Sequence, residues 1–524
     1  MLWKSASGLI RSGRSLPDVR LGLHCAGRVA QCCLGKIKQI GIVALVCSLA
    51  SPCVVVASSQ QAQSSGRGLP PDVELAFRIN APKRLFVQSQ FRGGPEGFTV
   101  LGLCINKWLG MVRCDSNVKN LKVKELSTGK ELVLEHPEPN VWIFDNAPGE
   151  KVSLEYELQF ATSPSSQAYE SRAMEESITF FGNTGILLPE HLVNSPSCRF
   201  RYTWSGEIPQ NWRPVSSFAV NATSYEVSLP AVRFLSSIFS IGKYREEELQ
   251  RPSKAPIHAI WIDGHLGDDE ANETLRVLSS VETAIERSQE EIQGIFWFFM
   301  PLKNSQVTAV SLTSSIVVFV PLDFSDKAPR SARAANLQTI AHELVHHTNA
   351  GRILLSGSPG PANLIPEGAA EFLGRRALLR AGLINQQECL QILSGKVANY
   401  SAGTNSADAP ENLGDLFLLM LDSEIRQHSQ GKKDVIALLG SMIALAQRKQ
   451  GMIMLSWSQF ADMVRPLTSP DFFARVQGMV SGQTAFVPPR DLESACAVSP
   501  DAPLRSFGFG VNSAGSRQAQ QSSR

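Results

Sequence analysis

The sequence predicts a multidomain α+β protein, with strand-forming segments in the first half of the chain and helical segments in the second. Apolar and polar residues alternate strictly over Val152–Phe160 and again over Cys198–Trp204, as in half-buried strands. After about residue 331 the apolar spacing becomes helical and continues to about residue 481. With 524 residues, 43% of them hydrophobic, the chain is long enough to form several cores.

The overall charge is close to neutral, because 50 lysine and arginine residues face 48 aspartate and glutamate residues. Proteins that bind nucleic acid usually carry a strong basic field, so no nucleic-acid partner is expected. The charge is unevenly distributed, since residues 1–38 hold seven basic residues and one acid. The chain beyond residue 57 therefore has a net charge of −4.

Residues 1–57 predict export, because an apolar run over residues 40–57 directly follows the basic segment. Compact residues at Val55–Ala57 suit cleavage by a signal peptidase after Ala57. The basic segment is long for a signal peptide, so an uncleaved membrane anchor formed by residues 40–57 stays open as the alternative. Both interpretations place the remaining chain in the periplasm or another extracytoplasmic space.

The rest of the chain divides by composition and periodicity. Residues 58–71 are rich in Ser, Gln, Gly and Pro and predict a linker, and residues 72–250 predict a β-sandwich domain with Gly, Pro and Asn turns. In the next domain, residues 251–385, we expect strands at Ile257–Ile262, Ile295–Met300 and Ser315–Val320 and a helix over Glu270–Ile292. Residues 386–490 predict a helical domain, and residues 491–524 a tail that is disordered at its end.

The cysteines are also unevenly distributed. Five of the ten lie within residues 1–57, and no Cys-x-x-Cys pair occurs among the other five. A zinc site built from cysteines is therefore not expected. Cys104 and Cys114 are close enough in sequence to lie on adjacent strands and pair in an oxidising compartment. The odd number beyond residue 57 leaves at least one thiol free, and a buried free cysteine is the ordinary case.

The segment His342-Glu-Leu-Val-His346 lies within a helical stretch. Residues four apart share one helix face, so His342 and His346 can bind one metal ion while Glu343 stands beside it. The alternative is a polar helix with two solvated histidines.

A second helix follows, beginning near Pro366 and ending near Gly382. On it Glu367 and Glu371 are one turn apart. Glu367 follows His346 by 21 positions, which allows a loop to fold this helix back and supply a third ligand. Two histidines, one glutamate and a water make the open tetrahedral site of catalytic Zn²⁺. Glu371 would then accept the remaining N–H of a ligand histidine, unless the pair is simply a solvated face.

The metal motif and the helix Pro366-Glu-Gly-Ala-Ala-Glu-Phe372 resemble those of gluzincin metallopeptidases, and the exported region resembles the glycyl aminopeptidase family. The resemblance covers about residues 75 to 490. Outside the metal motif it rests on Trp142 with Pro148, the Val152–Phe160 strand, Phe181–Gly185 and Leu413–Arg426. It implies a β-sandwich, a thermolysin-like zincin catalytic domain and a C-terminal helical domain. Many members add a PDZ-like domain, for which the 34 residues after Arg490 are too few.

Two departures from the family pattern concern substrate binding. Family members usually carry a Gly-Gly-Leu-Glu-His-like stretch, whose glutamate holds the substrate's amino terminus in related aminopeptidases. Residues 307–316 stand in its place without any acid, which argues against strict aminopeptidase specificity. Related enzymes also use a Tyr three residues before a Gly to stabilise the oxyanion, but before Gly414 that position is Glu411. Tyr400 and His428 are the nearest substitutes.

These observations predict an exported metallopeptidase with one Zn²⁺ per chain, acting on peptide or protein substrates. His342, His346 and Glu367 would hold the zinc, and Glu343 would be the general base toward a metal-activated water. One alternative is a catalytically impaired descendant that binds peptides or a partner protein and keeps the metal site. Another, a structural envelope protein, requires both helical motifs to be coincidences. The sequence leaves open the amino- or endopeptidase mode and the oligomeric state.

Overall fold

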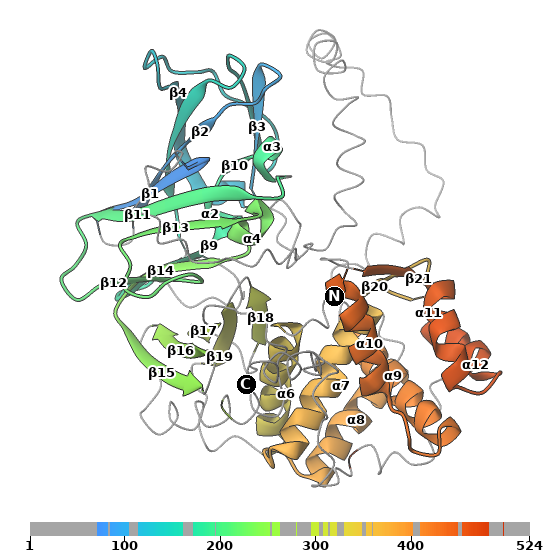
Figure 1. The fold of residues 1–524 in the computed structure, drawn as a ribbon. Helices are drawn as coiled ribbons and strands as arrows, with labels where there is room; N and C mark the ends of the chain where they lie inside the picture. Colours follow the sequence, from blue (N-terminus) through green and yellow to red (C-terminus); the bar gives the residue numbers. More distant parts are fainter. Residues whose placement is uncertain are drawn as a thin grey trace, which may run out of the picture. The chain divides into compact units, whose positions relative to one another are not determined.

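Figure 1 shows the computed structural model of the chain with its helices and strands labelled. The structure describes residues 71–81, 84–103, 114–160, 171–193, 195–251, 254–262, 279, 295–302, 308–312, 315–321, 330–347, 353–358, 360–401, 409–448, 453–481 and 496. All of these residues belong to one compact unit, Pro52–Arg524. Within these described ranges, no helix is long and apolar enough to cross a membrane. The predicted leader, the linker up to residue 70 and the helix predicted over 270–292, except Ser279, lie outside them.

Residues 73–242, here called the strand region, form three sheets around one apolar core. The six-stranded sheet has the order β13-β11-β1-β2-β7-β4. Its strands are β1 (Val73–Ala81), β2 (Arg84–Arg92), β4 (Val118–Glu125), β7 (Lys151–Leu158), β11 (Cys198–Gly206) and β13 (Ser224–Leu229). Every pair in this sheet is antiparallel except β1 with β11.

Two four-stranded sheets complete the strand region, with the orders β10-β3-β6-β5 and β12-β14-β9-β8. The first contains β3 (Phe98–Gly102), β5 (Glu135–Glu138), β6 (Val141–Asp145) and β10 (Leu188–Pro189). The second contains β8 (Arg172–Ala173), β9 (Ser177–Phe181), β12 (Arg213–Ser216) and β14 (Ile238–Gly242). Short helical turns lie between them: η2 (Asp115–Asn117), α2 (Gly182–Gly185), α3 (Glu190–Val193) and α4 (Ala231–Leu235).

The alternating sequence of these strands explains which side chains are buried. Along β7, Val152, Leu154, Tyr156 and Leu158 face the core, while Glu155 faces solvent. The same period of two governs β11, because successive side chains of a strand point to opposite faces. The strands predicted from the alternation at 152–160 and 198–204 are thereby confirmed.

A five-stranded sheet of order β15-β16-β17-β19-β18 follows the strand region. It consists of β15 (Tyr244–Arg251), β16 (Lys254–Ile262), β17 (Ile295–Leu302), β18 (Thr308–Leu312) and β19 (Ser315–Pro321), so the three predicted strands are confirmed. Strands β16, β17 and β19 run parallel. Alternate residues of β17 enter two different cores: Phe298 packs with Phe181 of the strand region, and Trp297 packs with the helices. The strands read as continuous apolar runs because both faces of the sheet are covered.

Residues 330–480, here called the helical region, are mainly helical. Its helices are α6 (Arg330–His347), α7 (Leu364–Arg380), α8 (Gln386–Ser401), α9 (Ala409–His428), α10 (Val435–Arg448), α11 (Trp457–Val464) and α12 (Phe472–Val480), with a 3-10 turn η4 (Arg465–Leu467). A short parallel pair, β20 (Ile353–Ser356) with β21 (Ile453–Ser456), joins its two halves. Helices α6 to α9 lie side by side, share one core with the five-stranded sheet, and give the chain its mixed α+β fold (Figure 1).

Glycines allow α7 to approach two neighbouring helices closely. A Cβ on Gly368 would lie 2.4 Å from the carbonyl oxygen of Gly414, so α7 and α9 meet backbone to backbone. A Cβ on Gly374 would lie 3.1 Å from the backbone of His342, on α6. Helix α7 ends as predicted, since Gly382 just beyond it has a φ of +67°. The close packing fixes α7 against the helix that carries the histidine motif.

The cysteines only partly follow the prediction. Cys389 of α8 forms a disulfide with Cys496, across 107 residues of sequence, a link that no sequence pattern suggested. Cys114 is disulfide-bonded, but Cys104, its predicted partner, lies outside the described residues. Cys198 is a buried free thiol, in agreement with the odd number of cysteines beyond residue 57.

Candidate metal centre

Two histidines of α6 face the same point because they are one helical turn apart. The Nε2 atoms of His342 and His346 are 2.9 Å apart. His342 is almost completely buried, with 5% of its surface exposed, and His346 is half-buried. The helix therefore presents two imidazole nitrogens to one site, as the spacing predicts.

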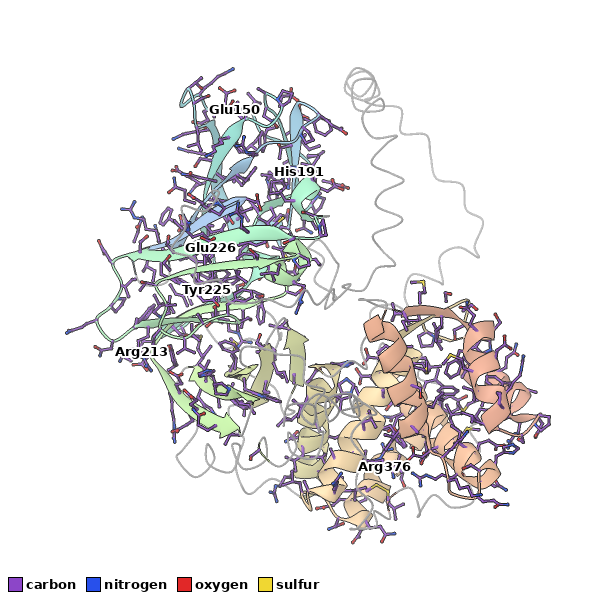
Figure 2. The ribbon with its side chains drawn as sticks, viewed as in Figure 1. Glu150, His191, Arg213, Tyr225, Glu226 and Arg376 are labelled. Carbon is purple, nitrogen blue, oxygen red and sulfur yellow. A yellow bond between two sulfur atoms is a disulfide. The ribbon has the colours of Figure 1, made fainter. Side chains whose placement is uncertain are left out.

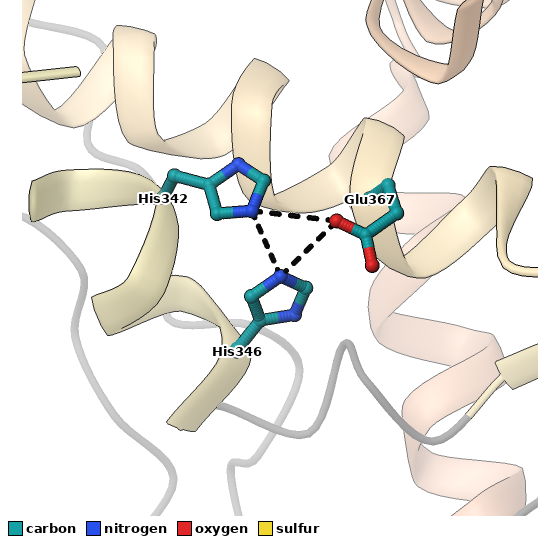
Figure 3. A group of neighbouring side chains, drawn as sticks. All are labelled: His342, His346 and Glu367. Carbon is teal, nitrogen blue, oxygen red and sulfur yellow. Dashed lines mark hydrogen bonds and ion pairs between the residues drawn. The ribbon is translucent and has the colours of Figure 1, made fainter. Parts of the chain in front are cut away.

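Helix α7 brings a carboxylate to these nitrogens. Glu367 Oε2 lies 3.4 Å from the Nε2 atoms of both His342 and His346 (Figure 3). The other carboxylate oxygen, Oε1, accepts a 3.4 Å hydrogen bond from Asn363 Nδ2, at the start of α7. This leaves Oε2 turned toward the histidines. The three donor atoms lie together although His346 and Glu367 are far apart in sequence.

The three donor atoms fit a zinc ion in composition and in spacing. Two imidazoles and a carboxylate are the protein ligands of many catalytic zinc sites. Ligands at zinc distances of about 2.1 Å in a tetrahedral arrangement are themselves about 3.4 Å apart. Two of the three separations, at 3.4 Å, match that spacing, and the third is shorter at 2.9 Å. All three donor atoms lie within 4.8 Å of one another.

The charges around His342 favour a cation at this site. Burial acts to lower the pKa of the His342 imidazole, but the carboxylates of Glu367, Glu371 and Glu343 outweigh burial and raise that pKa well above its usual value. For Glu367 the balance has the opposite sign: burial acts to raise its pKa, and the two histidines hold it far below its usual value. Positive charge between these groups is therefore stabilised, which is what a divalent ion would supply.

Glu371, one turn after Glu367 on α7, lies behind His342. Its Oε1 is 3.2 Å from His342 Nδ1, although the two groups are not aligned as a regular hydrogen bond. Its Oε2 accepts a 2.6 Å hydrogen bond from Gln338 Nε2 and lies 3.0 Å from Lys396 Nζ. Burial acts to raise the pKa of Glu371, but Lys396 and His342 lower it far below its usual value. The carboxylate is thus charged and faces the ring nitrogen that points away from Glu367.

Glu343 follows His342 directly on α6 and is half-buried. Its charge acts on His342, which places its carboxylate in the electrostatic surroundings of the cluster. Its role as general base stays a prediction.

Glu411, near the start of α9, also belongs to these surroundings. Its side chain is exposed, yet partial desolvation raises the pKa of its carboxyl group. The carboxylates of Glu371 and Glu367 act in the same direction, and the charges of His342 and Lys396 oppose them. An acid therefore stands near the site at the position where related enzymes carry a tyrosine.

The two other substitutes for that tyrosine do not lie at the cluster. The hydroxyl of Tyr400 donates a 2.8 Å hydrogen bond to the carbonyl oxygen of Met479, on α12. His428 ends α9, about 25 Å along the helix from Glu411 at 1.5 Å per residue. The structure therefore identifies no replacement tyrosine or histidine donor among the candidates named from sequence.

Sequence reasoning missed the buried charges behind Glu371. Lys396 of α8, Asp415 of α9 and Arg375 of α7 are all at least 90% buried. None follows a motif, and a lone charged residue in a helix is usually solvated. Arg375 alone gave a weak local signal, because it lies four residues after Glu371 and so on the same face of α7.

Comparisons with known proteins concern the fold. No protein-family model and no curated protein matches this sequence. The structure is similar to that of an aminopeptidase N family protein from Idiomarina loihiensis, with a TM-score of 0.63, 13% identity, and coverage of 79% of this chain and 77% of that one. The two chains share a fold.

Weaker likenesses are to an M1 zinc metallopeptidase from Deinococcus radiodurans, with a TM-score of 0.47, 13% identity, and coverage of 81% of this chain and 97% of that one. A mutant of an M1 zinc metallopeptidase from the same organism, bound to a Tyr-Ser-Ala substrate, has a TM-score of 0.46 and 14% identity, with coverage of 81% and 96%. The shared fold rests on the likeness to the Idiomarina protein.

Proposed function

We propose that this chain is an exported zinc metallopeptidase that hydrolyses peptide bonds with Glu343 as general base. The observation that carries the proposal is the convergence of His342, His346 and Glu367 donor atoms at separations of 2.9 to 3.4 Å. A purely structural zinc site has no need of a carboxylate in the position of Glu343, next to a ligand.

The residues of the site would have two tasks, holding the metal ion and transferring protons. His342, His346 and Glu367 would hold one Zn²⁺ per chain. When bound, the ion would make a water more acidic and polarise the peptide carbonyl. Glu343 would take the proton of the attacking water at its carboxylate and pass it to the leaving amine. Glu371 would keep His342 in the tautomer that turns Nε2 toward the ligand cluster.

Export is supported by two separate observations. The basic segment and apolar run of residues 1–57 have the order of an export signal or anchor. The Cys389–Cys496 disulfide is typical of proteins in an oxidising compartment. We therefore place the folded part of the chain outside the cytoplasm, either released by cleavage after Ala57 or held at the membrane by residues 40–57.

The substrate proposal is a peptide or protein with no requirement for a free amino terminus. Residues 307–316, which include the edge strand β18 next to α6, contain no acid to pair with a terminal ammonium.

A second candidate function is a peptide- or protein-binding descendant that keeps the metal but turns over slowly. The observation that favours it is Glu411 at the position of the oxyanion tyrosine, with Tyr400 bonded elsewhere. Loss of an oxyanion donor typically costs about a hundredfold or more in rate.

The experiment that separates the two uses the full chain, a peptide panel with free and blocked amino termini, and the variant Glu343→Gln. Glu135→Gln, which makes the same chemical change in the exposed strand β5, is the matched control. The peptidase proposal expects wild type and Glu135→Gln to cleave at least one peptide and Glu343→Gln to be about 10²- to 10⁴-fold slower. Zinc binding with no turnover of any peptide would favour the binding protein.

A further inference from the structure

Behind the candidate metal centre, five buried ionisable side chains follow one another, with basic and acidic groups in alternation. They come from four helices: His342 of α6, Glu371 of α7, Lys396 of α8, Asp415 of α9 and Arg375 of α7. Buried charges are costly unless each one is paired, so a continuous series of this kind is not expected from packing alone.

The first half of the series fixes the Glu371 carboxylate at both oxygens. Oε1 faces His342 Nδ1 at 3.2 Å, and Oε2 receives both Gln338 Nε2 at 2.6 Å and Lys396 Nζ at 3.0 Å. Gln338 Nε2 also donates to the backbone carbonyl of Glu371 at 2.9 Å. The carboxylate therefore cannot turn away from His342 without also losing its contacts to Gln338 and Lys396.

The second half of the series fixes Lys396. Its Nζ lies 3.5 Å from Asn412 Oδ1 and 3.7 Å from Asp415 Oδ2, both on α9. Asp415 in turn receives both terminal nitrogens of Arg375, one of them at 2.8 Å from Oδ1. Since Arg375 lies one turn after Glu371 on α7, the series that starts at His342 of α6 returns to α7, the helix that also carries Glu367. Of the lysine and arginine of the series, it is Lys396 that touches Glu371.

We propose that Lys396 is a positioning residue for the metal centre: its ammonium fixes the Glu371 carboxylate, which in turn fixes the His342 ring with Nε2 toward His346 and Glu367. The inference rests on the proposed zinc site and goes beyond it, because α8 then contributes to metal affinity without touching the metal. Residues that orient a ligand histidine typically change metal affinity or activity about 10- to 100-fold when replaced.

The helical region provides a matched pair of charges that lacks this connection. Arg376, labelled in Figure 2, is the neighbour of Arg375 on α7, and its Nη1 lies 3.5 Å from Asp422 Oδ2 on α9. Asp422 is linked to Arg426 at 2.8 Å and to the backbone N–H of Val435 at 2.9 Å. The contacts of this pair lead away from Glu371. Replacing Arg376 therefore perturbs packing between the same two helices without disturbing the histidine.

The test measures the zinc dissociation constant of the full chain by competition with a chelator, for wild type, Lys396→Met, Lys396→Arg and Arg376→Met. The expected result is an affinity about 10- to 100-fold weaker for Lys396→Met, most of the affinity recovered in Lys396→Arg, and no change in Arg376→Met. Cobalt substituted for zinc gives a second readout, since its visible spectrum reports ligand geometry. We expect that spectrum to change in Lys396→Met alone.

Each other outcome has a definite meaning. Equal zinc affinity and equal cobalt spectra in Lys396→Met and wild type would overturn the positioning role. Equal losses in Lys396→Met and Arg376→Met would also overturn it, because the effect would then be general destabilisation. If wild type binds no zinc, the proposed function fails instead. Should Lys396→Met fail to fold, Lys396→Gln takes its place, and affinity equal to that of Lys396→Arg would contradict the proposal.

Discussion

The strand region and the helical region both close around apolar cores, but they bury different polar groups. In the strand region the buried polar pairs are largely neutral hydroxyls, such as Thr179 with Ser240 and Tyr202 with Ser216, each 2.7 Å apart. In the helical region they are ionised groups, such as Arg375 with Asp415. Burying a hydrogen-bonded pair of neutral groups costs little free energy. A buried ion pair, in contrast, often makes the fold no more stable than two apolar side chains in its place would. The comparison indicates that the buried polar groups of the strand region serve stability, whereas those of the helical region serve the candidate metal centre.

Aromatic rings dominate the strand region. Phe239 is fully buried, and its ring centroid lies 5.3 to 5.5 Å from those of Phe77, Phe180 and Tyr202. Edge-to-face and stacked rings at such distances add to the hydrophobic free energy of burial. No charge takes part in this cluster.

The largest loss of stability is expected from Phe239→Ala. Removing a fully buried ring leaves a cavity among the aromatic neighbours and costs about 3 to 5 kcal/mol of unfolding free energy. Urea unfolding measures it, with Phe218→Ala, a half-buried ring, as the control that loses less. Zinc binding by the folded fraction stays at the wild-type level if the two regions have separate tasks. A fall in zinc affinity would contradict the view that the two regions have separate tasks.

Asp415→Ala should lose a similar amount for a different reason. This variant leaves the buried guanidinium of Arg375 without its carboxylate partner, and breaking such a pair costs about 3 to 5 kcal/mol of unfolding free energy. Replacing both partners, as Asp415→Leu with Arg375→Met, should recover most of that loss, because two apolar side chains need no partner. Urea unfolding of the single and double variants measures how much of the lost stability is recovered. A double variant as unstable as Asp415→Ala would show that this ion pair stabilises the helical region on its own.

Loss of the Cys389–Cys496 link should cost somewhat less. A disulfide that closes a long segment, here 107 residues, contributes about 2 to 4 kcal/mol by restricting the unfolded chain. The variant Cys389→Ala tests this by its urea midpoint. Cys198→Ala, at the buried free thiol of the strand region, is the control and should lose clearly less. Equal losses in both variants would mean that packing of the thiols, not the link, matters.

The smallest of these effects is expected at a single neutral hydroxyl. Tyr156 OH donates to the carbonyl oxygen of Gly185 at 2.9 Å and accepts from the N–H of Leu187 at 3.1 Å. Tyr156→Phe leaves both backbone groups buried without that partner and should cost about 1 to 3 kcal/mol. Tyr225→Phe, at a half-buried ring labelled in Figure 2, should lose less. Equal urea midpoints for Tyr156→Phe and wild type would contradict the role of neutral hydrogen bonds in the strand region.

Local periodicity predicted the strands and helices that position the site. The alternation around Tyr156 gave β7, and the apolar runs gave β16, β17 and β19, because each pattern follows from which faces of a strand are covered. The spacing of His342 and His346 placed two imidazoles on one helix face, and the structure brings Glu367 to them. These features depend on residues close in sequence or on one turn of helix.

The unpredicted features depend on tertiary contacts between distant residues. Lys396 reaches Glu371 from another helix, and Cys389 pairs with Cys496 across 107 residues. Neither carries a local signal, since a lysine in a helix is usually solvated and cysteine pairing is not fixed by sequence. Sequence reasoning had pointed only to Cys104 and Cys114 as a pair.

The central claim is that His342, His346 and Glu367 hold zinc for peptide hydrolysis, and the zinc content of the purified full chain tests it most directly. We expect one zinc per chain in wild type, close to one in Glu343→Gln, and far less in Glu367→Ala, which removes a ligand. Wild-type protein that takes up no zinc, or Glu367→Ala protein that holds as much zinc as tightly as wild type, would contradict the account.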